Sequence, residues 1–265
     1  MLFLWHAAAL LSGSSIGLLG VYVVGMRMPF LGIGIAHAAL AGAVAGHVFG
    51  FPPFICALLL ALIAALLTSW LTTSSAQADL GTVTGIMLSF TMGIAFLAMG
   101  FNQGDMSPVL SMMWGSILFV RKTSLILMAV LSGVLFIFLY LCRLPMDSLL
   151  FSRTAARISG MNEKKLLMVF MLISAFVITV NLQIVGGLLM YSLLTNPAAA
   201  AYALGRNMKS VRVFAMLSGV VSTIGGLWIS YLWDLSTGAC IVLVSTALYS
   251  FALIATWKFK KQPLQ

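Results

Sequence analysis

Residues 52–73 read PPFICALLLALIAALLTSWLTT and contain no charged side chain. A helix of about 20 residues crosses the roughly 30 Å hydrocarbon core of a bilayer, so a stretch of this length and composition predicts a transmembrane helix. Over the whole chain of 265 residues, 62% are apolar and 7% are charged. Soluble domains carry roughly 25% charged residues, and the composition therefore excludes a water-soluble protein.

Similar apolar stretches recur on both sides of this one, and they predict an all-α polytopic membrane protein. We expect a bundle of about 8 to 9 transmembrane helices in a single domain, residues 1–265. A β-barrel is disfavoured because the apolar residues run continuously instead of alternating. The stretch from Pro108 to Val120 is too short to span and is expected to lie at the interface or to dip into it. The predicted spans are 3–26, 30–50, 52–73, 79–100, 123–142, 165–183, 185–204, 211–232 and 237–257.

The basic residues stand at the ends of these spans, which indicates membrane topology and no nucleic-acid partner. With the N-terminus outside, twelve of the 14 Lys and Arg residues fall on the cytoplasmic side, as the positive-inside rule requires. Only Arg121 and Lys122 fall outside. The expected location is a bacterial inner or plasma membrane, with multiple passes.

Pairs of glycines four residues apart predict close contacts between helices, because lipid gives no hydrophobic drive and packing must hold the bundle together. The pairs are Gly13 and Gly17, Gly42 and Gly46, Gly46 and Gly50, and Gly81 and Gly85.

His37, in the second span, is the strongest candidate metal ligand. Imidazole suits zinc, manganese or iron, and an ionisable group at membrane depth calls for a functional reason. A neutral histidine hydrogen-bonded across helices is the alternative. His47 is also a candidate metal-binding residue, but it lies about 15 Å further along a straight helix and on another face, so it is expected near the outer mouth. Asp79, at the inner end of the fourth span, is a further candidate metal-binding residue.

The seventh span carries Asn196 and Pro197, which are candidates for the translocation path. Proline removes a helix hydrogen bond, so a kink or break is expected there, and broken helices at membrane depth often line transport cavities. A packing kink satisfied by a neighbouring helix is the alternative. Asp105 and Asp234 are expected on the outer face.

The longest polar stretch, residues 144–165, falls on the cytoplasmic side and is interpreted as a short amphipathic helix. It is either a solvated connector or an element that docks a cytoplasmic partner. The sequence contains no HExxH and no GxxxxGK[ST] motif, and no GxSxG in the strand and turn context of a serine hydrolase. We therefore predict no enzymatic activity, and any ATP hydrolysis must reside in another chain.

Four stretches resemble the membrane subunit of ATP-binding cassette importers for zinc, manganese or iron. The order and spacing of these stretches carry the likeness more than any one of them does. They are RMPFLGIGIAHAALAGAVAG (27–46), ADLGTVTGIMLSFTMGIAFL (78–97) followed by Asp105 and MMWGSILFV (112–120), RTAARISGMN (153–162), and VGGLLMYSLLTNPAAAAYAL (185–204) followed by WDLSTGACIVLV (233–244).

The chain departs from the family pattern beside the histidine. Where the family usually has an aspartate four residues before the histidine and a serine directly before it, this chain has Ile33 and Ala36. An Asp and a His at i and i+4 share a helix face and could hold one cation together. With only His37 left of that pair, the ion would need groups from other helices or a second subunit, or another species is transported.

The resemblance implies a homodimer that works with two cytoplasmic ATPase subunits and an extracytoplasmic solute-binding protein. It also implies that Arg153, Ala156, Arg157 and Gly160 belong to a helix that couples the permease to the ATPase. On the outer face, Asp105 and Asp234 could dock the binding protein or attract cations, or could simply be solvated. The transported divalent metal is the implied ligand, and no bound cofactor is expected. Two alternatives stay open: a permease for a chelated metal or cofactor such as a siderophore, and a secondary carrier or channel that works alone.

Overall fold

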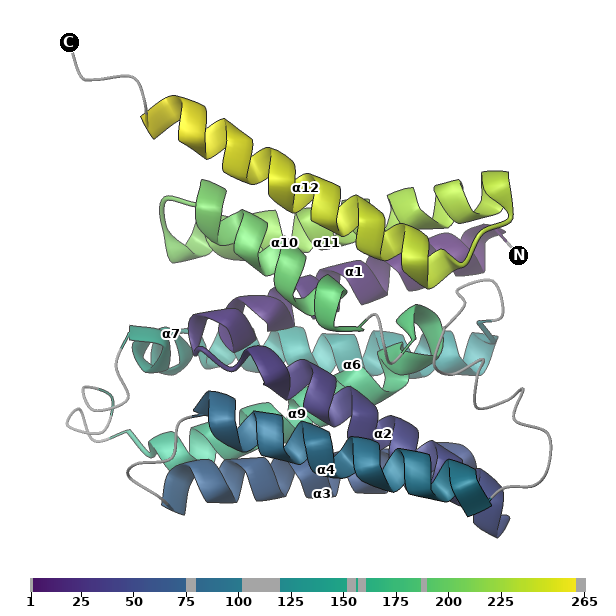
Figure 1. Ribbon diagram of the computed structural model, residues 1–265. Coiled ribbons are helices and arrows are strands. Elements are labelled where there is room, and N and C mark those ends of the chain that lie inside the picture. Colours follow the sequence, from purple (N-terminus) through teal and green to yellow (C-terminus); the bar gives the residue numbers. More distant parts are fainter. Residues whose placement is uncertain are drawn as a thin grey trace.

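The computed structural model describes residues 2–74, 80–101, 120–151, 156, 161–186 and 190–260. Every long element in these ranges is an α-helix (Figure 1). The helices are α1 (Leu2–Gly25), α2 (Pro29–Phe49), α3 (Pro53–Ser74), α4 (Leu80–Phe101), α6 (Lys122–Leu141), α7 (Arg143–Phe151), α9 (Glu163–Val185), α10 (Met190–Leu204), α11 (Met208–Trp233) and α12 (Thr237–Lys260).

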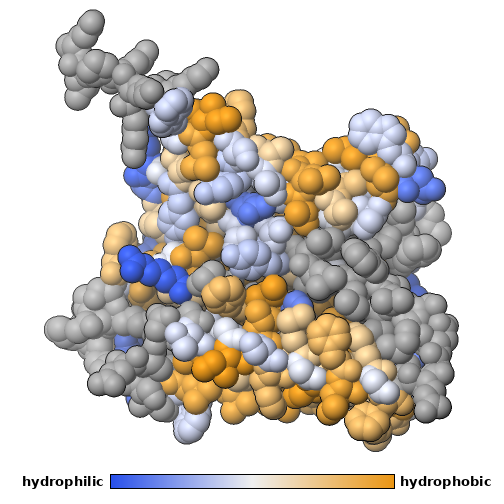
Figure 2. All heavy atoms as spheres, viewed as in Figure 1, coloured by the Kyte–Doolittle hydropathy of each residue, from blue (hydrophilic) through white to orange (hydrophobic). Residues whose placement is uncertain are grey.

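Within the described ranges, 8 helices are long and apolar enough to cross a membrane, which confirms the predicted all-α polytopic fold. They are α1, α2, α3, α4, α6, α9, α11 and α12. Their exposed surface is rich in large apolar side chains, as lipid contact requires. In Figure 2 apolar residues spread over the lower part of the view, where α3 and α4 lie in Figure 1.

The predicted span 185–204 is shorter in the structure. Helix α9 runs on to Val185, and it ends at Gly186, whose φ of 86° does not fit a helix. Helix α10 begins only at Met190 and has 15 residues, a length of about 22 Å at 1.5 Å per residue. Pro197 lies inside α10, which continues through it without a break.

The helices form two groups joined across the middle of the bundle (Figure 1). Helix α1 packs against α10 and α11, and α12 packs against both of these. On the other side α2 packs against α3 and α4, while α9 contacts α3 and α6. Helix α1 is the central element, because an unbroken run of its residues from Ser15 to Val23 is buried.

Glycines set the close approach of α1 to α11. A Cβ on Gly13 or Gly17 would collide with the backbone carbonyls of Gly219 and Ala215, respectively. Between α2 and α3, a Cβ on Gly42 would collide with the carbonyl of Cys56. These contacts are the backbone packing that the glycine spacing predicts. Gly85 on α4 is different, because within the described part of the chain nothing lies within 4 Å of the position of its Cβ.

The two ends of the bundle differ in charge. The N-terminus and the turn between α11 and α12 lie at one end, and α7 lies at the other end with the turn between α1 and α2 (Figure 1). Arg27, Arg143, Arg206 and Lys209 all stand at helix ends on the α7 side. Arg121 precedes α6 at the opposite end. This is the grouping of basic residues that the predicted topology requires, with the α7 end cytoplasmic.

Candidate functional site: a buried histidine and a polar junction at the α7 end

His37 lies in the first half of α2, and only 2% of its surface is exposed. Its Nδ1 lies 2.9 Å from the backbone carbonyl oxygen of Ile33, one helical turn earlier. A carbonyl oxygen can only accept a hydrogen bond, so Nδ1 carries the proton and donates it. In the neutral ring this fixes the tautomer and leaves the lone pair on Nε2, the arrangement found in many metal-ligating histidines.

The neighbours of His37 on its own helix supply no second ionic ligand. One turn before it stands Ile33, whose carbonyl is already bonded to the ring. Helix α2 is enclosed by α3, α4, α9 and α10, so any further group must reach His37 from another helix or another chain. Among the residues that the structure describes, no group of three or more His, Cys, Asp or Glu side chains could hold a metal ion.

The other candidate ligands do not join His37. His47 stands in the last turn of α2 and is exposed, at the end of the bundle opposite α7. Asp79 and Asp105 fall outside the described residues. Asp234 is exposed and closes α11 in the left-handed region, with φ 51° and ψ 43°.

Asn196 fastens α10 to α12. Its side-chain amide donates hydrogen bonds to the hydroxyls of Ser245 at 3.1 Å and Thr246 at 3.0 Å. Pro197 is buried, and its carbonyl accepts a hydrogen bond of 3.2 Å from Ser218 on α11. Both predicted path residues therefore contact neighbouring helices, and their place in a translocation path stays a prediction.

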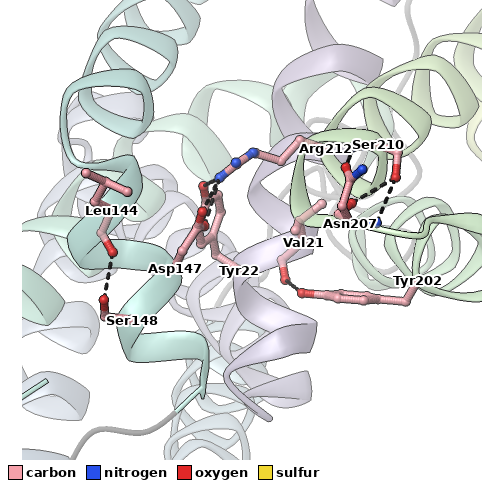
Figure 3. A network of polar contacts seen from close by, with 9 residues as sticks. All are labelled: Val21, Tyr22, Leu144, Asp147, Ser148, Tyr202, Asn207, Ser210 and Arg212. Atoms are coloured by element: carbon pink, nitrogen blue, oxygen red, sulfur yellow. Dashed lines mark hydrogen bonds and ion pairs between the residues drawn. The ribbon is translucent and has the colours of Figure 1, made fainter. Parts of the chain in front are cut away.

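A polar junction ties three helices together at the α7 end (Figure 3). Arg212 on α11 donates from Nη1 to the carboxylate of Asp147 on α7, at 2.8 and 3.1 Å. The same nitrogen lies 2.9 Å from the hydroxyl of Tyr22 on α1. The two charged side chains are 17% and 21% exposed, so the ion pair is largely shielded from solvent. Charge-assisted hydrogen bonds of this kind are stronger than neutral ones.

Two further features support this junction. The Tyr202 hydroxyl donates to the backbone carbonyl of Val21 at 2.8 Å, which joins the end of α10 to α1 (Figure 3). Asn207 caps α11: its side chain accepts from the backbone of Ser210 at 2.8 Å, and the Ser210 hydroxyl bonds back to the Asn207 backbone N–H at 3.2 Å. This reciprocal cap fixes the first turn of α11, just ahead of Arg212.

The predicted coupling residues follow α7 directly. Of these, Ala156 is described and is 1% exposed within the main apolar core. Arg153, Arg157 and Gly160 lie outside the described residues. From the sequence, Asp147 belongs to a predicted solvated or docking loop, Arg212 is only one of the basic residues that indicate topology, and Tyr22 carries no signal. Their separation by 65 and 190 residues left no local pattern that could have paired them.

Aromatic rings gather at the end of the bundle opposite α7. Trp5 and Tyr231 have ring centroids 6.2 Å apart, and His6 and Trp228 have centroids 5.6 Å apart in an edge arrangement. Amphipathic rings of this type concentrate where a membrane meets water. They mark one boundary of the bilayer, as the basic residues mark the other.

These features define a multi-pass α-helical membrane protein with one deeply buried histidine and a polar junction at its basic end. The sequence pattern of the ABC 3 transport family matches residues 1–256, and the chain belongs to this family.

Named relatives cover nearly the whole chain. The chain is 29% identical to the high-affinity zinc uptake system membrane protein ZnuB of Haemophilus influenzae, over 97% of both chains. It is 26% identical to the manganese transport system membrane protein MntC of Halalkalibacterium halodurans, over 92% of this chain and 84% of the relative. The fold resembles PsaBC from Streptococcus pneumoniae, solved with a Fab, with a TM-score of 0.82, 23% identity and coverage of 95% and 90%.

Proposed function

We propose that this chain is the membrane permease subunit of an ATP-driven importer for divalent transition-metal ions. The observation that carries the proposal is membership of the ABC 3 transport family over residues 1–256. Relatives that match over nearly the whole chain are named for zinc and for manganese transport. Since both ions accept imidazole ligands, a buried histidine is compatible with either cargo.

His37 is the proposed ligand within this chain. Its proton on Nδ1 is held by the Ile33 carbonyl, which leaves Nε2 as the atom that can bind a cation. One imidazole cannot hold an ion alone, so the remaining ligands come from outside the described residues, from a second copy of the chain or from water. A weak, incomplete site suits a transport path, because an ion must leave as readily as it enters.

The α7 end is the proposed side for energy coupling. Residues 153–160 follow α7, and Arg212 on α11 connects α7 to α1 and α11 through its hydrogen bonds to Asp147 and Tyr22. A separate cytoplasmic ATPase that moves this segment would move these two helices with it. An extracytoplasmic solute-binding protein would deliver the ion at the opposite end, where Asp234 is exposed and where Asp105 is expected. A second copy of the chain would complete the path.

Reconstitution tests the proposal directly. Vesicles that contain the chain together with its ATPase and binding protein are expected to accumulate zinc or manganese only when ATP is supplied to the ATPase. Vesicles with the chain alone should show no uptake. Full-rate uptake by the chain alone would show that it is a self-sufficient carrier or channel.

The ligand role of His37 is tested in the same vesicles. We expect His37→Ala to lower metal uptake by about tenfold, the loss that follows from about 1.4 kcal/mol of binding energy. His47→Ala, on the same helix but exposed, is the matched control and should retain uptake. Equal uptake by both variants at equal protein levels would reject the ligand role while leaving the transporter class standing.

A further inference from the structure

A groove opens between α6 and α11, with α1 as its floor. Its volume is about 630 Å³. The walls are apolar, with Phe136 and Ile137 from α6, Val213 and Met216 from α11, and Leu18 from α1. Ile137 and Val213 are 61% and 47% exposed, so the groove is open to the surroundings of the bundle.

One end of this groove is strongly basic. Arg143, Lys209 and Arg212 all line it, at the end of the bundle that carries α7. Arg212 is paired with Asp147, while Arg143 and Lys209 are exposed and have no ion-pair partner within the described part of the chain. The Arg143 guanidinium lies 5.9 Å from the centroid of the Tyr140 ring, which is also in the groove wall. Three cations against one carboxylate leave the mouth of the groove with a net positive charge.

The basic and apolar parts are arranged along the membrane normal. On α11 the lining runs from Lys209 at the helix start to Met216, a distance of about 10 Å at 1.5 Å per residue. On α6 the lining ends at Leu141, next to Arg143 at the start of α7. The groove therefore offers cations at the level of the helix ends and only apolar contacts deeper in the bilayer.

We propose that this groove is a binding site for one anionic glycerophospholipid. The phosphodiester would lie between Arg143 and Lys209, and the upper part of an acyl chain would lie along Val213, Met216 and Ile137. Arg212 closes the inner side of the mouth and stays bound to Asp147 and Tyr22. Basic pockets between transmembrane helices at a membrane surface attract anionic headgroups.

Charge complementarity favours this occupant over others. A zwitterionic lipid would fill the apolar part but would leave the excess of positive charge uncompensated. A free phosphate would meet the cations but would leave the apolar walls exposed. A helix from a second copy would need an acidic side chain at this level, and the cations of this chain would repel their own counterparts.

Native mass spectrometry of the full-length chain tests the site. The chain, with any subunits that copurify, is placed in nanodiscs with equal amounts of phosphatidylglycerol and phosphatidylcholine of matched acyl chains. We expect one phosphatidylglycerol per chain to survive activation that removes phosphatidylcholine. The double variant Arg143→Gln and Lys209→Gln should lower this retention by about thirtyfold, since each surface cation contributes about a fivefold preference for an anionic lipid.

Two variants separate a specific site from general attraction. Val213→Trp fills the groove without a change in charge, and it should abolish the preference as fully as the double variant does. Arg121→Gln with Lys122→Gln removes the same two charges at the other end of the bundle, and it should leave the preference unchanged.

Several results would overturn the proposal. The site does not exist if phosphatidylglycerol and phosphatidylcholine leave together, or if the Arg121 and Lys122 variant loses as much lipid as the groove variant. Displacement of the lipid by millimolar inorganic phosphate would assign the cations to a soluble anion. Efficient disulfide cross-linking of Val213→Cys between two chains would assign the groove to a second copy.

Discussion

Two glycine-bearing surfaces of this bundle behave in opposite ways. Where α1 meets α11, Gly13, Gly17 and Gly219 bring the backbones into contact, and Thr223 adds a hydrogen bond of 2.7 Å to the carbonyl of Ala9. On α4, Gly85, Gly93 and Gly100 have no atom of the described residues within 4 Å of their Cβ positions. Glycine spacing therefore shows where a helix could approach closely, and only the three-dimensional arrangement decides whether one does.

The largest effect is expected from Gly219→Val in the α1–α11 contact. The added side chain would collide with the backbone of Gly13, and the helices would have to separate. Overpacking of this kind costs about 3 kcal/mol of folding free energy. Reversible unfolding in mixed micelles measures the loss, and Gly93→Val on α4 is the control that should lose far less. Equal losses would show that helix propensity, and not the contact, sets the cost.

A smaller loss of folding free energy is expected when the polar junction at the end of the same contact is broken. Asp147→Asn removes the charge that compensates Arg212 in a largely shielded pair, and we expect a cost of about 2 kcal/mol. The same unfolding assay measures it. In combination with Arg212→Gln, the total loss should be smaller than the sum of the single losses, because the stranded charge is gone. Strict additivity would mean that the two side chains do not interact.

Thr223→Val removes the hydroxyl that bonds α11 to α1 and that also lies 3.1 Å from the carbonyls of Gly219 and Val220 on its own helix. The variant keeps the shape of the side chain but loses the donor to Ala9. Hydrogen bonds between membrane helices contribute about 0.6 kcal/mol on average, so the folding free energy should fall by about that amount. Unfolding curves of the two proteins under identical conditions provide the comparison. A loss as large as that of Gly219→Val would make this bond, and not the backbone packing, the main stabilising feature.

The smallest effect, and one of opposite sign, is expected from Gly93→Ala on α4. None of the described residues lies near the new methyl group, and alanine is the better helix former, so stability should rise by about 0.5 kcal/mol. The informative second measurement is transport in the reconstituted system. Lost transport at full stability would show that another chain packs on this face of α4 during the cycle.

The sequence predicted the helices better than their contacts. The predicted spans 52–73 and 123–142 match α3 and α6 to within one residue, because uninterrupted apolar stretches report bilayer thickness directly. The prediction for the span 185–204 was wrong at its start, because α9 ends at Gly186 within the apolar run VGGLL. Hydropathy carries no information on where one helix stops inside an apolar run.

The same limit applies to the candidate site. The position of His37 within an apolar span predicted its depth, and the structure adds the hydrogen bond to Ile33 that fixes its tautomer. The polar junction of Tyr22, Asp147 and Arg212 was not predictable. The distribution of Lys and Arg along the chain indicates the membrane side of a residue but not its partner. The glycine pairs in α1 and at Gly42 and Gly46 in α2 predicted close packing correctly, while Gly50 and Gly85 have no such contact within the described residues.

The polar junction also constrains how this sequence can change during evolution. One guanidinium nitrogen serves both Tyr22 and Asp147, so the three positions are not free to drift separately. Loss of Arg212 leaves the carboxylate of Asp147 without its partner, and loss of Asp147 leaves the guanidinium of Arg212 without its partner. Selection therefore disfavours either single substitution. Homologues should therefore either keep the acid and the base together or replace both, and a lineage that has exchanged the two charges would record a compensated double substitution.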